Sequence, residues 1–384
     1  MKIKNIFDLL DLEELERDYE YLYENAEVGF TLTKTKEYVY KRLAKMGIKA
    51  ENCGRCGLTA LIGDKTADKT ILLRADMDAI NIEGKGVMHA CGHAMHTAML
   101  LSAARILKNP EYTKGIRVRL MFQPAEEILE GCKDMINAGV IDDVDAAFMI
   151  HVTSGTHHPT GTVIFASSGD IAPSADFFSI TVKGKGSHGA EPHKAIDPIV
   201  TAAHIITAIS NIQSRELPIG DSAVITIGKI VGGSAANVIP NAVSMAGTTR
   251  AYSEKTRDYV KTRLDQITAD VSHAFRAEGA VEFTSGCPPF KNDEKMLKVA
   301  LAAAEKTFGK EKVVVLPQGV RGGGSEDFSY ISREVPTAMA LLSAGEIKNG
   351  YKYPLHNLNV KFDKTALPFG TMLLVNVVKE FAKE

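Results

Sequence analysis

The sequence predicts an α/β fold with a mixed, mostly parallel sheet that is interrupted by a small inserted α+β domain. First, short apolar runs alternate with helical segments over residues 58–152, a pattern typical of a parallel sheet covered by helices on both faces. Second, the order strand, helix, strand, strand, helix, strand appears over residues 175–287 and indicates a split βαβ unit. Third, the strand–helix alternation returns afterwards. We expect one domain from residues 1–174 and 288–384, and an inserted domain from residues 175–287.

The elements of the outer domain follow from periodicity and turn residues. Residues 5–46 are expected to be helical, because apolar side chains recur at spacings of three and four and Gly47 ends the pattern. Short apolar runs bounded by turn residues predict strands. The expected strands are 58–62, 70–74, 115–122, 146–152, 313–316 and 337–342, and the further helices are 97–107, 125–138, 293–308 and 364–382.

The inserted domain begins with an alternating strand over residues 176–183. In this strand Phe177, Ser179, Thr181 and Lys183 share one face, because side chains alternate with a period of two. The elements that follow are a helix at 195–214, strands at 222–231 and 242–252, a helix at 254–278 and a short strand at 281–284.

Composition excludes several classes of protein. The chain has 384 residues, a net charge of -2, 45% hydrophobic and 24% charged residues, which is not the composition of a disordered chain. The near-neutral charge predicts no nucleic-acid partner. The sequence has no run of about eighteen apolar residues, so we expect no membrane span. Residues 1–20 are acidic and do not resemble a signal peptide. Five cysteines, an odd number, indicate reduced thiols and a cytoplasmic location.

Histidine, cysteine and glutamate side chains gather where predicted strands end. They occur in segments 88–96, 122–127 and 150–152, with His356 as a distant fourth candidate. Ligands of open α/β sheets collect outside the carboxyl ends of the strands. Taken singly, each residue has an ordinary interpretation, such as packing of a buried cysteine or acids that compensate a helix dipole. Taken together, they form a mixed nitrogen, oxygen and sulfur ligand set that suits Zn, Mn, Co or Ni.

Metal-assisted hydrolysis is the chemistry that requires such a set. Two divalent ions about 3.5–4 Å apart polarise a carbonyl group and acidify a water molecule. One carboxylate is needed as a ligand, and a second is needed as general base and acid. The adjacent Glu126 and Glu127 can supply both.

A series of motifs extends over nearly the whole chain. The motifs occupy residues 74–79, 88–93, 123–127, 187–193, 197–198, 236–240, 247–250, 324–330 and 356–357. In this order they resemble the metal-dependent amidohydrolases, in the branch of aminoacylases, hippurate hydrolases and auxin-conjugate hydrolases. The resemblance implies a dinuclear catalytic domain with an inserted lid and dimerisation domain, and therefore a homodimer that forms through residues 175–287.

The resemblance also implies roles for individual residues. Glu126 would be the general base and acid, and His188 would stabilise the oxyanion of the tetrahedral intermediate. Asn237 and Arg250 would hold the substrate carboxylate or help to build the oxyanion site. The implied metal ligands are Cys91, His93, Glu127, His151 and His356.

Some positions depart from the family pattern or allow two interpretations. Ala94 stands where the family has an aspartate after the ligand histidine, and the stretch between Ala79 and Val87 is short. Asp76 and Asp78 are either turn acids or groups that support the metal ligands. His96 either orients a ligand or has an ordinary structural role.

The expected activity is metal-dependent hydrolysis of the amide bond of N-acyl amino acids, for example N-acetyl amino acids. Two alternatives remain at the level of sequence. The first is a dipeptidase or carboxypeptidase of the same superfamily. The second is a metal-binding dimer that has lost catalysis, which only Ala94 supports.

Overall fold

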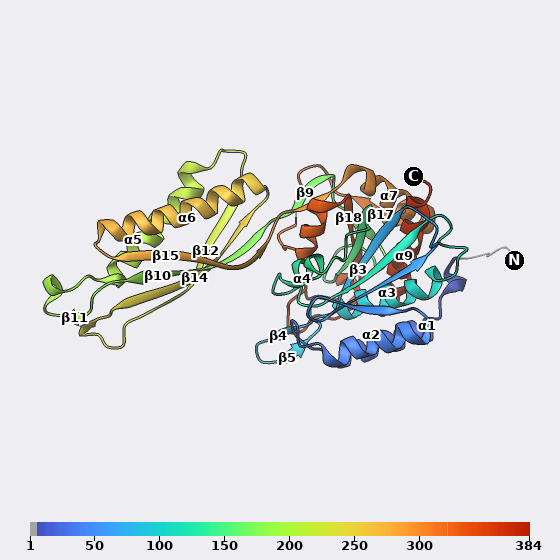
Figure 1. The fold of residues 1–384 in the computed structure, drawn as a ribbon, viewed down its shortest axis with the longest axis horizontal. Coiled ribbons are helices and arrows are strands. Elements are labelled where there is room, and N and C mark those ends of the chain that lie inside the picture. Colours follow the sequence, from blue (N-terminus) through green and yellow to red (C-terminus); the bar gives the residue numbers. More distant parts are fainter. Residues whose placement is uncertain (1–5, 321) are drawn as a thin grey trace. The chain divides into compact units, whose positions relative to one another are not determined.

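The computed structural model describes residues 6–320 and 322–384 and divides into two compact units (Figure 1). The first unit comprises Met1–Ile171, Lys291–Arg321 and Asp327–Glu384, and the second comprises Ala172–Phe290 and Gly322–Glu326. The predicted fold class is confirmed, because the first unit contains a mixed, mostly parallel sheet and the second contains a small α+β sandwich.

The first unit is built on an eight-stranded sheet with the order β1-β2-β6-β3-β7-β18-β8-β17. Its four central strands β6, β3, β7 and β18 are parallel, so their carboxyl ends lie along the same edge. The strands are β1 Ala50–Cys53, β2 Gly57–Gly63, β3 Thr70–Asp76, β6 Arg117–Gln123, β7 Ala146–Thr153, β8 Val163–Phe165, β17 Val313–Val315 and β18 Thr337–Ser343. Two small ladders join β4 (Ile80–Ile82) to β5 (Gly86–Met88) and β9 (Gly169–Ala172) to β16 (Phe290–Asn292).

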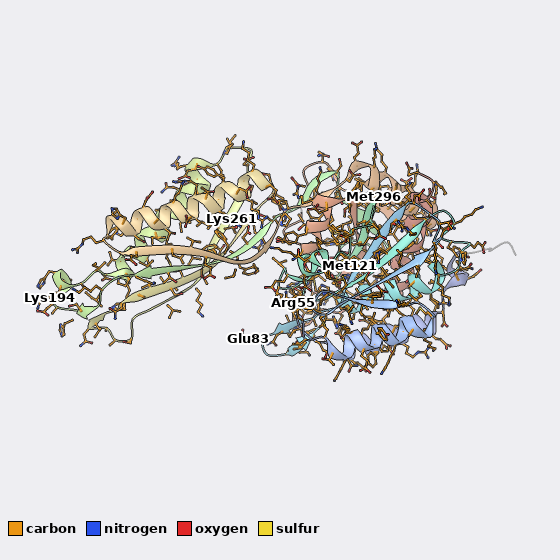
Figure 2. All side chains as sticks on the ribbon, viewed as in Figure 1. Arg55, Glu83, Met121, Lys194, Lys261 and Met296 are labelled. Carbon is orange, nitrogen blue, oxygen red and sulfur yellow. The ribbon has the colours of Figure 1, made fainter. Side chains whose placement is uncertain are left out.

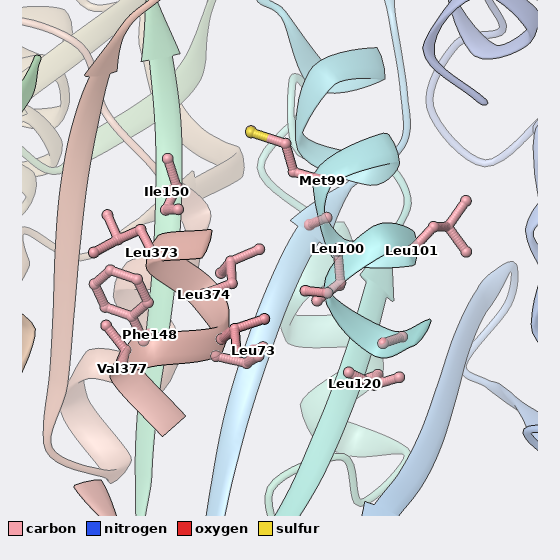
Figure 3. Packing of buried hydrophobic residues seen from close by; sticks show 14 of the residues in the cluster. Leu73, Met99, Leu100, Leu101, Leu120, Phe148, Ile150, Leu373, Leu374 and Val377 are labelled. Atoms are coloured by element: carbon pink, nitrogen blue, oxygen red, sulfur yellow. The ribbon is translucent and has the colours of Figure 1, made fainter. Parts of the chain in front are cut away.

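Helices cover this sheet and bury its apolar side chains. The helices are α1 Leu12–Glu24, α2 Thr33–Lys45, α3 His93–Leu107, α4 Gly131–Asn137, α7 Glu294–Phe308, α8 Ile331–Glu334 and α9 Leu367–Phe381. Figure 3 shows Leu373 and Val377 of α9 beside Phe148 of β7, within one apolar cluster. Alternate strand residues such as Leu72 and Met149 are also fully buried, so both faces of the sheet are covered.

The predicted helix over residues 125–138 is wrong in its first half. Residues 125–130 are not helical and include turns at 126–129, and α4 begins only at Gly131. Ala125 and Leu129 adopt φ angles of 55° and 58°, which a right-handed helix cannot accommodate. Gly131 is required because a Cβ atom there would lie 1.6 Å from the Pro124 carbonyl oxygen. The acids of this segment are therefore not first-turn residues of a helix.

Other differences from the predicted elements concern their ends. The predicted helical stretch 5–46 consists of a 3-10 helix, Ile6–Leu9, followed by α1 and α2, which non-helical residues 25–32 separate; residue 5 lies outside the described residues. Helix α3 begins four residues earlier than predicted, at His93. Helix α9 is preceded by a short 3-10 turn, Lys364–Ala366. None of the described helices has the length and apolar character needed to cross a bilayer.

The second unit is an antiparallel four-stranded sheet with two helices. The sheet order is β12-β14-β10-β15, and the sequence order β10, α5, β12, β14, α6, β15 matches the predicted split βαβ pattern. The elements are β10 Ala175–Lys183, β11 Ser187–His188, α5 Pro198–Asn211, β12 Ala223–Gly232, β13 Val238–Ile239, β14 Ala242–Ala251, α6 Glu254–Ala274 and β15 Glu278–Cys287.

One face of this small sheet forms the core of the second unit. Phe178, Ile180 and Val182 of β10 are buried against apolar side chains of α5 and α6, such as Ile205 and Leu264. The intervening side chains of β10 are exposed or partly exposed, which confirms the predicted alternation. Helix α6 ends before the predicted residue 278, because a left-handed residue follows it and β15 then begins.

Candidate metal centre

The carboxyl edge of the parallel strands brings all five predicted metal ligands together. Their donor atoms form overlapping groups in which every atom lies within 4.8 Å of the others. The groups are Cys91–His93–His151, Cys91–Glu127–His356 and His93–Glu126–Glu127. The predicted base Glu126 thus lies in the same cluster as the predicted ligands, which come from four separate segments of the chain.

A glycine that precedes α3 positions the first two of these side chains. Gly92 is the N-cap of α3 and adopts φ 95°, a conformation that favours glycine. A Cβ atom at this position would lie only 2.3 Å from Cγ2 of Val152. The close approach of the Gly92 backbone to the Val152 side chain, together with the positive φ, therefore requires glycine between Cys91 and His93, and it brings both residues next to the end of β7.

Asp78 holds the two glutamates in their turn. Its Oδ1 accepts a hydrogen bond from the Glu126 amide at 3.1 Å, and its Oδ2 accepts one from the Glu127 amide at 3.2 Å. Asp78 is fully buried. The structure therefore supports the interpretation of Asp78 as a group that supports the candidate ligands, and not as a turn acid. The carboxylate fixes the backbone of both glutamates, whose side chains reach the cluster from the end of β6.

His151 presents a ring nitrogen with a lone pair to Cys91. Its Nδ1 lies 2.7 Å from the Val152 carbonyl oxygen, which can only accept, so Nδ1 carries the proton. Nε2 is then unprotonated and lies 3.5 Å from the Cys91 sulfur. A backbone carbonyl that fixes the tautomer in this way is a common support for a metal-binding histidine.

A buried charged network lies behind the cluster. The Val152 amide donates to Nε2 of His96 at 2.8 Å, so the His96 Nδ1 proton is donated to Asp76 Oδ1 at 2.6 Å. Arg74 donates to Asp76 Oδ2 at 2.7 Å and to Asp327 Oδ1 at 3.3 Å. The sequence interpretation left Asp76 and His96 open and missed Arg74 and Asp327. The signal available in the sequence was Arg74, a charged residue inside the buried strand β3. A buried charge requires partners, so Arg74 indicates a buried charged network.

The electrostatics of the cluster favour a positive charge. The fully buried His93 ring lies within 3.9 Å of four carboxylates, those of Asp76, Asp78, Glu126 and Glu127. Burial lowers the pKa of His93, but Asp76 and the other carboxylates outweigh it and raise the pKa to about 10. For Glu127 and Cys91 the effect of burial is the opposite. It is the main reason why the pKa of Glu127 rises to about 7 and that of the Cys91 thiol rises well above its ordinary value.

The donors present fit a divalent transition metal. Both ring nitrogens of His93 and Oε1 of Glu127 are buried and make no hydrogen bond to the described residues, which is costly unless another partner satisfies them. His356 adopts a left-handed φ of 63° while its Nε2 lies 3.5 Å from Glu127 Oε1. Imidazole, carboxylate and thiol donors together suit the metals predicted from the sequence.

The remaining predicted residues lie elsewhere in the fold. His188 is exposed on β11, and its neighbour Gly189 donates a backbone hydrogen bond to the Asn237 carbonyl at 2.8 Å. Arg250 lies on β14 and is partly buried. All three predicted substrate residues therefore belong to the second unit. Ala94 lies in the first turn of α3 and is buried in the apolar cluster, while Asp76 and Asp78 supply the carboxylates next to His93.

Comparisons with known proteins place this arrangement in a family. Residues 72–380 match the model of peptidase family M20/M25/M40. N-acetyl-L-cysteine deacetylase of Bacillus subtilis (strain 168) is 36% identical over 332 residues, which are 83% of this chain and 78% of the relative. Thermostable carboxypeptidase 2 of Saccharolobus solfataricus is also 36% identical, over 91% of both chains. IAA-amino acid hydrolase ILR1-like 4 of Arabidopsis thaliana is 32% identical, over 94% of this chain and 84% of the relative.

Solved structures show the same fold. A structure from methicillin-resistant Staphylococcus aureus superposes with a TM-score of 0.87, at 29% identity and over 96% of both chains. The YXEP protein of Bacillus subtilis, described as a dinuclear metal-binding peptidase of the M20 family, superposes with a TM-score of 0.78. It is 26% identical, over 97% of this chain and 98% of that chain. The chain therefore belongs to peptidase family M20/M25/M40 and is a hydrolase of that family.

Proposed function

We propose that this protein hydrolyses the amide bond of N-acyl amino acids, such as N-acetyl amino acids, with two divalent ions of Zn, Mn, Co or Ni. The observation that carries the proposal is the position of Glu126 beside the five-residue donor cluster. A carboxylate that can move a proton lies next to donors that suit a metal, which is the arrangement required for metal-assisted hydrolysis.

Five residues would hold the ions in this proposal. They are Cys91, His93, Glu127, His151 and His356. When bound, divalent ions of this kind polarise the scissile carbonyl and lower the pKa of water. His93 must lose its proton to become a ligand, and Asp76 and Asp78 then orient its ring.

Glu126 is the proposed general base and acid. Its backbone is fixed by the hydrogen bond to Asp78, and its Oε2 lies 3.9 Å from Nε2 of His93. The side chain therefore lies at the cluster and does not cap a helix. It would accept the proton of the attacking water and return it to the nitrogen of the leaving amino acid.

The second unit would supply substrate contacts and the dimer interface. His188 would stabilise the oxyanion, and Asn237 and Arg250 would contact the substrate carboxylate or the oxyanion. Exposure of Val224, Ile230 and Val231 along the edge strand β12 supports pairing with a second copy, because an exposed apolar edge strand is a ready pairing surface. Five buried cysteine thiols support the proposed cytoplasmic location.

Substrate preference distinguishes hydrolysis of N-acyl amino acids from the peptidase alternative. The relatives named above include a deacetylase, a carboxypeptidase and an amino acid conjugate hydrolase, and a thiol in the donor set supports the acylase branch. A panel of N-acetyl amino acids, N-benzoyl amino acids and dipeptides should show the highest kcat/KM for an acylated amino acid. A dipeptide as the best substrate would instead establish the peptidase alternative.

The decisive test is Glu126→Gln with metal content measured alongside turnover. We expect about two transition metal ions per chain in both proteins, and a loss of about 10²–10⁴-fold in kcat for the variant. Glu130→Gln is the matched control, because Glu130 follows in the same segment but pairs with Arg55 at the surface. Full turnover by Glu126→Gln with metal bound would refute the proposed mechanism.

The same experiment also tests the alternative that the protein is a metal-binding dimer that has lost catalysis. A wild-type protein that binds two metal ions but turns over no member of the panel would support it. Ala94→Asp would then show whether the missing family carboxylate is the cause. Restored turnover in that variant would identify Ala94 as the lesion.

A further inference from the structure

A basic cavity lies in the first unit, outside the proposed ligand set. Its volume is about 380 Å³, within the range of pockets for small molecules. It is formed by the β4–β5 hairpin, by the C-terminal end of α1, and by residues 350–353 and 358–361. None of its lining residues is a proposed metal ligand, so the cavity is a feature that the proposed hydrolysis does not explain.

Three lysines line the cavity without a counter-charge. They are Lys85, Lys352 and Lys361, and the lining contains no aspartate or glutamate. None of the three pairs with a carboxylate among the described residues, whereas the nearby Lys348 and Lys364 pair with Glu346 and Glu20. The three lysines are exposed and together give the hollow a positive potential that favours an anion between them.

The hairpin that carries Lys85 also contains an acid, which does not line the cavity. Glu83 is labelled in Figure 2 in the turn between β4 and β5, but it is absent from the lining and forms no ion pair among the described residues. The positive character of the cavity is therefore not cancelled by its own hairpin.

Three tyrosines add uncharged donors to the same cavity. They are Tyr23, Tyr351 and Tyr353. Their hydroxyl groups make no hydrogen bond to the part of the chain that the structure describes. Each hydroxyl can donate one hydrogen bond to an oxyanion, and each ammonium can donate three. The cavity thus combines charge with directed donors, which a merely solvated group of lysines does not.

We propose that this cavity binds a small organic polyanion, either a polycarboxylate or a phosphate ester. Lysine ammonium groups act as point charges that suit carboxylate and phosphate oxygens, and the tyrosine hydroxyls orient the bound group. The volume of about 380 Å³ suits a small molecule.

The position of the cavity connects it to the backbone of the donor cluster. Its lining includes residues on both sides of His356, and Met88 lies three residues before Cys91. The His356 amide donates to the Ala90 carbonyl at 3.0 Å. A bound polyanion would therefore tie together the two segments that carry Cys91 and His356.

The test is calorimetric titration of the metal-loaded protein with two weakly chelating probes, tricarballylate and glucose 6-phosphate. We expect saturable binding of one molecule per chain for at least one probe, weakened by added salt. The triple variant Lys85→Gln, Lys352→Gln, Lys361→Gln should bind at least about tenfold more weakly. Tighter binding of tricarballylate assigns a polycarboxylate, and tighter binding of glucose 6-phosphate assigns a phosphate ester.

A second triple variant controls for net charge. Lys65→Gln, Lys114→Gln, Lys310→Gln removes the same charge from exposed lysines outside the cavity, and it should bind as the wild type does. Equal weakening in the two variants, or no saturable binding of either probe to the wild type, would overturn the proposal. If the cavity variant fails to fold, Lys352→Gln alone should still weaken binding, while Tyr353→Phe tests the hydroxyl contribution.

Discussion

The two units of the molecule differ in how they hold their charged side chains. In the first unit, Arg74, Asp76 and His93 are 0–2% exposed and contact one another or their immediate neighbours. In the second unit, His188 is exposed and Arg263 pairs with Glu216 near the surface. The first unit therefore fixes its chemistry by burial, where an unpaired charge is costly. The Arg263–Glu216 pair of the second unit is partly exposed, where an ion pair contributes little, although Asp176 of that unit is buried beside Arg257.

The largest expected difference between the units is in stability. Arg74→Met should lower the free energy of unfolding by about 3–5 kcal/mol, because it removes the buried guanidinium group that pairs with Asp76 and Asp327. Arg263→Met, the matched change in the second unit, should cost about 0–1 kcal/mol. Urea unfolding of both variants measures the difference. Equal unfolding midpoints would show that the buried network does not stabilise the first unit.

Metal affinity should depend on the buried network and not on a histidine of the second unit. His96→Leu removes one hydrogen-bond partner of Asp76 and the acceptor of the Val152 amide, so we expect about 10–100-fold weaker metal binding. His204→Leu is the control, because His204 is exposed and stacks on Phe275 of the second unit. Competition with a chromogenic chelator measures both affinities. An unchanged affinity in His96→Leu would mean that the network does not orient the ligands.

The metal-free first unit should lose stability as the pH rises. The pKa of His93 is about 10 in the folded protein and about 6.5 in an unfolded chain. Because the folded pKa is the higher one, the stabilisation is complete below about pH 6.5 and is lost as the pH approaches about 10.

The contribution of His93 to this pH dependence is measured by comparing the stability of the wild type with that of a His93 variant. Urea midpoints of chelator-treated wild type and His93→Gln should converge as the pH rises through this window, since only the wild type loses a stabilising proton. Parallel pH profiles for the two proteins would contradict the assigned role of His93.

The smallest expected stability effect is at the edge of the second unit. Ile230 is 53% exposed on β12 in the single chain, so Ile230→Asp should change the free energy of unfolding of the monomer by no more than about 0.5 kcal/mol. Ile180→Ala, in the core of the same unit, should cost about 2–5 kcal/mol. Sedimentation of Ile230→Asp tests the proposed dimer edge, and an unchanged dimer would place the interface elsewhere.

Local patterns predicted most of the fold. The alternation of β10 and the apolar runs of β3, β6 and β7 are properties of neighbouring residues, so they can be seen in the sequence. Even the donor cluster could be predicted in part, because Glu127 lies just beyond the carboxyl end of the parallel strand β6 and His151 lies near that of β7, whereas Cys91 follows the small antiparallel ladder of β4 and β5. Knowledge that parallel strands share an edge is enough to expect that they meet.

The turn at residues 125–130 could not be predicted in this way. Its composition suits a helix, but the Asp78 carboxylate binds two of its amides from a different strand end. The same is true of the Arg74–Asp327 contact, which joins residues 253 positions apart. Interactions between distant segments leave no local periodicity, so propensity alone gives the wrong element or no signal.

The sequence by itself determined the order of elements, the family and the residue types available for metal binding, because hydrophobic periodicity and motif spacing are local. The tertiary structure alone decided which acids surround His93, which tautomers His96 and His151 adopt, and that three lysines line one cavity without a counter-charge. The physical reason is that pKa values, tautomers and cavities depend on burial and on distances between segments, and these exist only once the chain has folded.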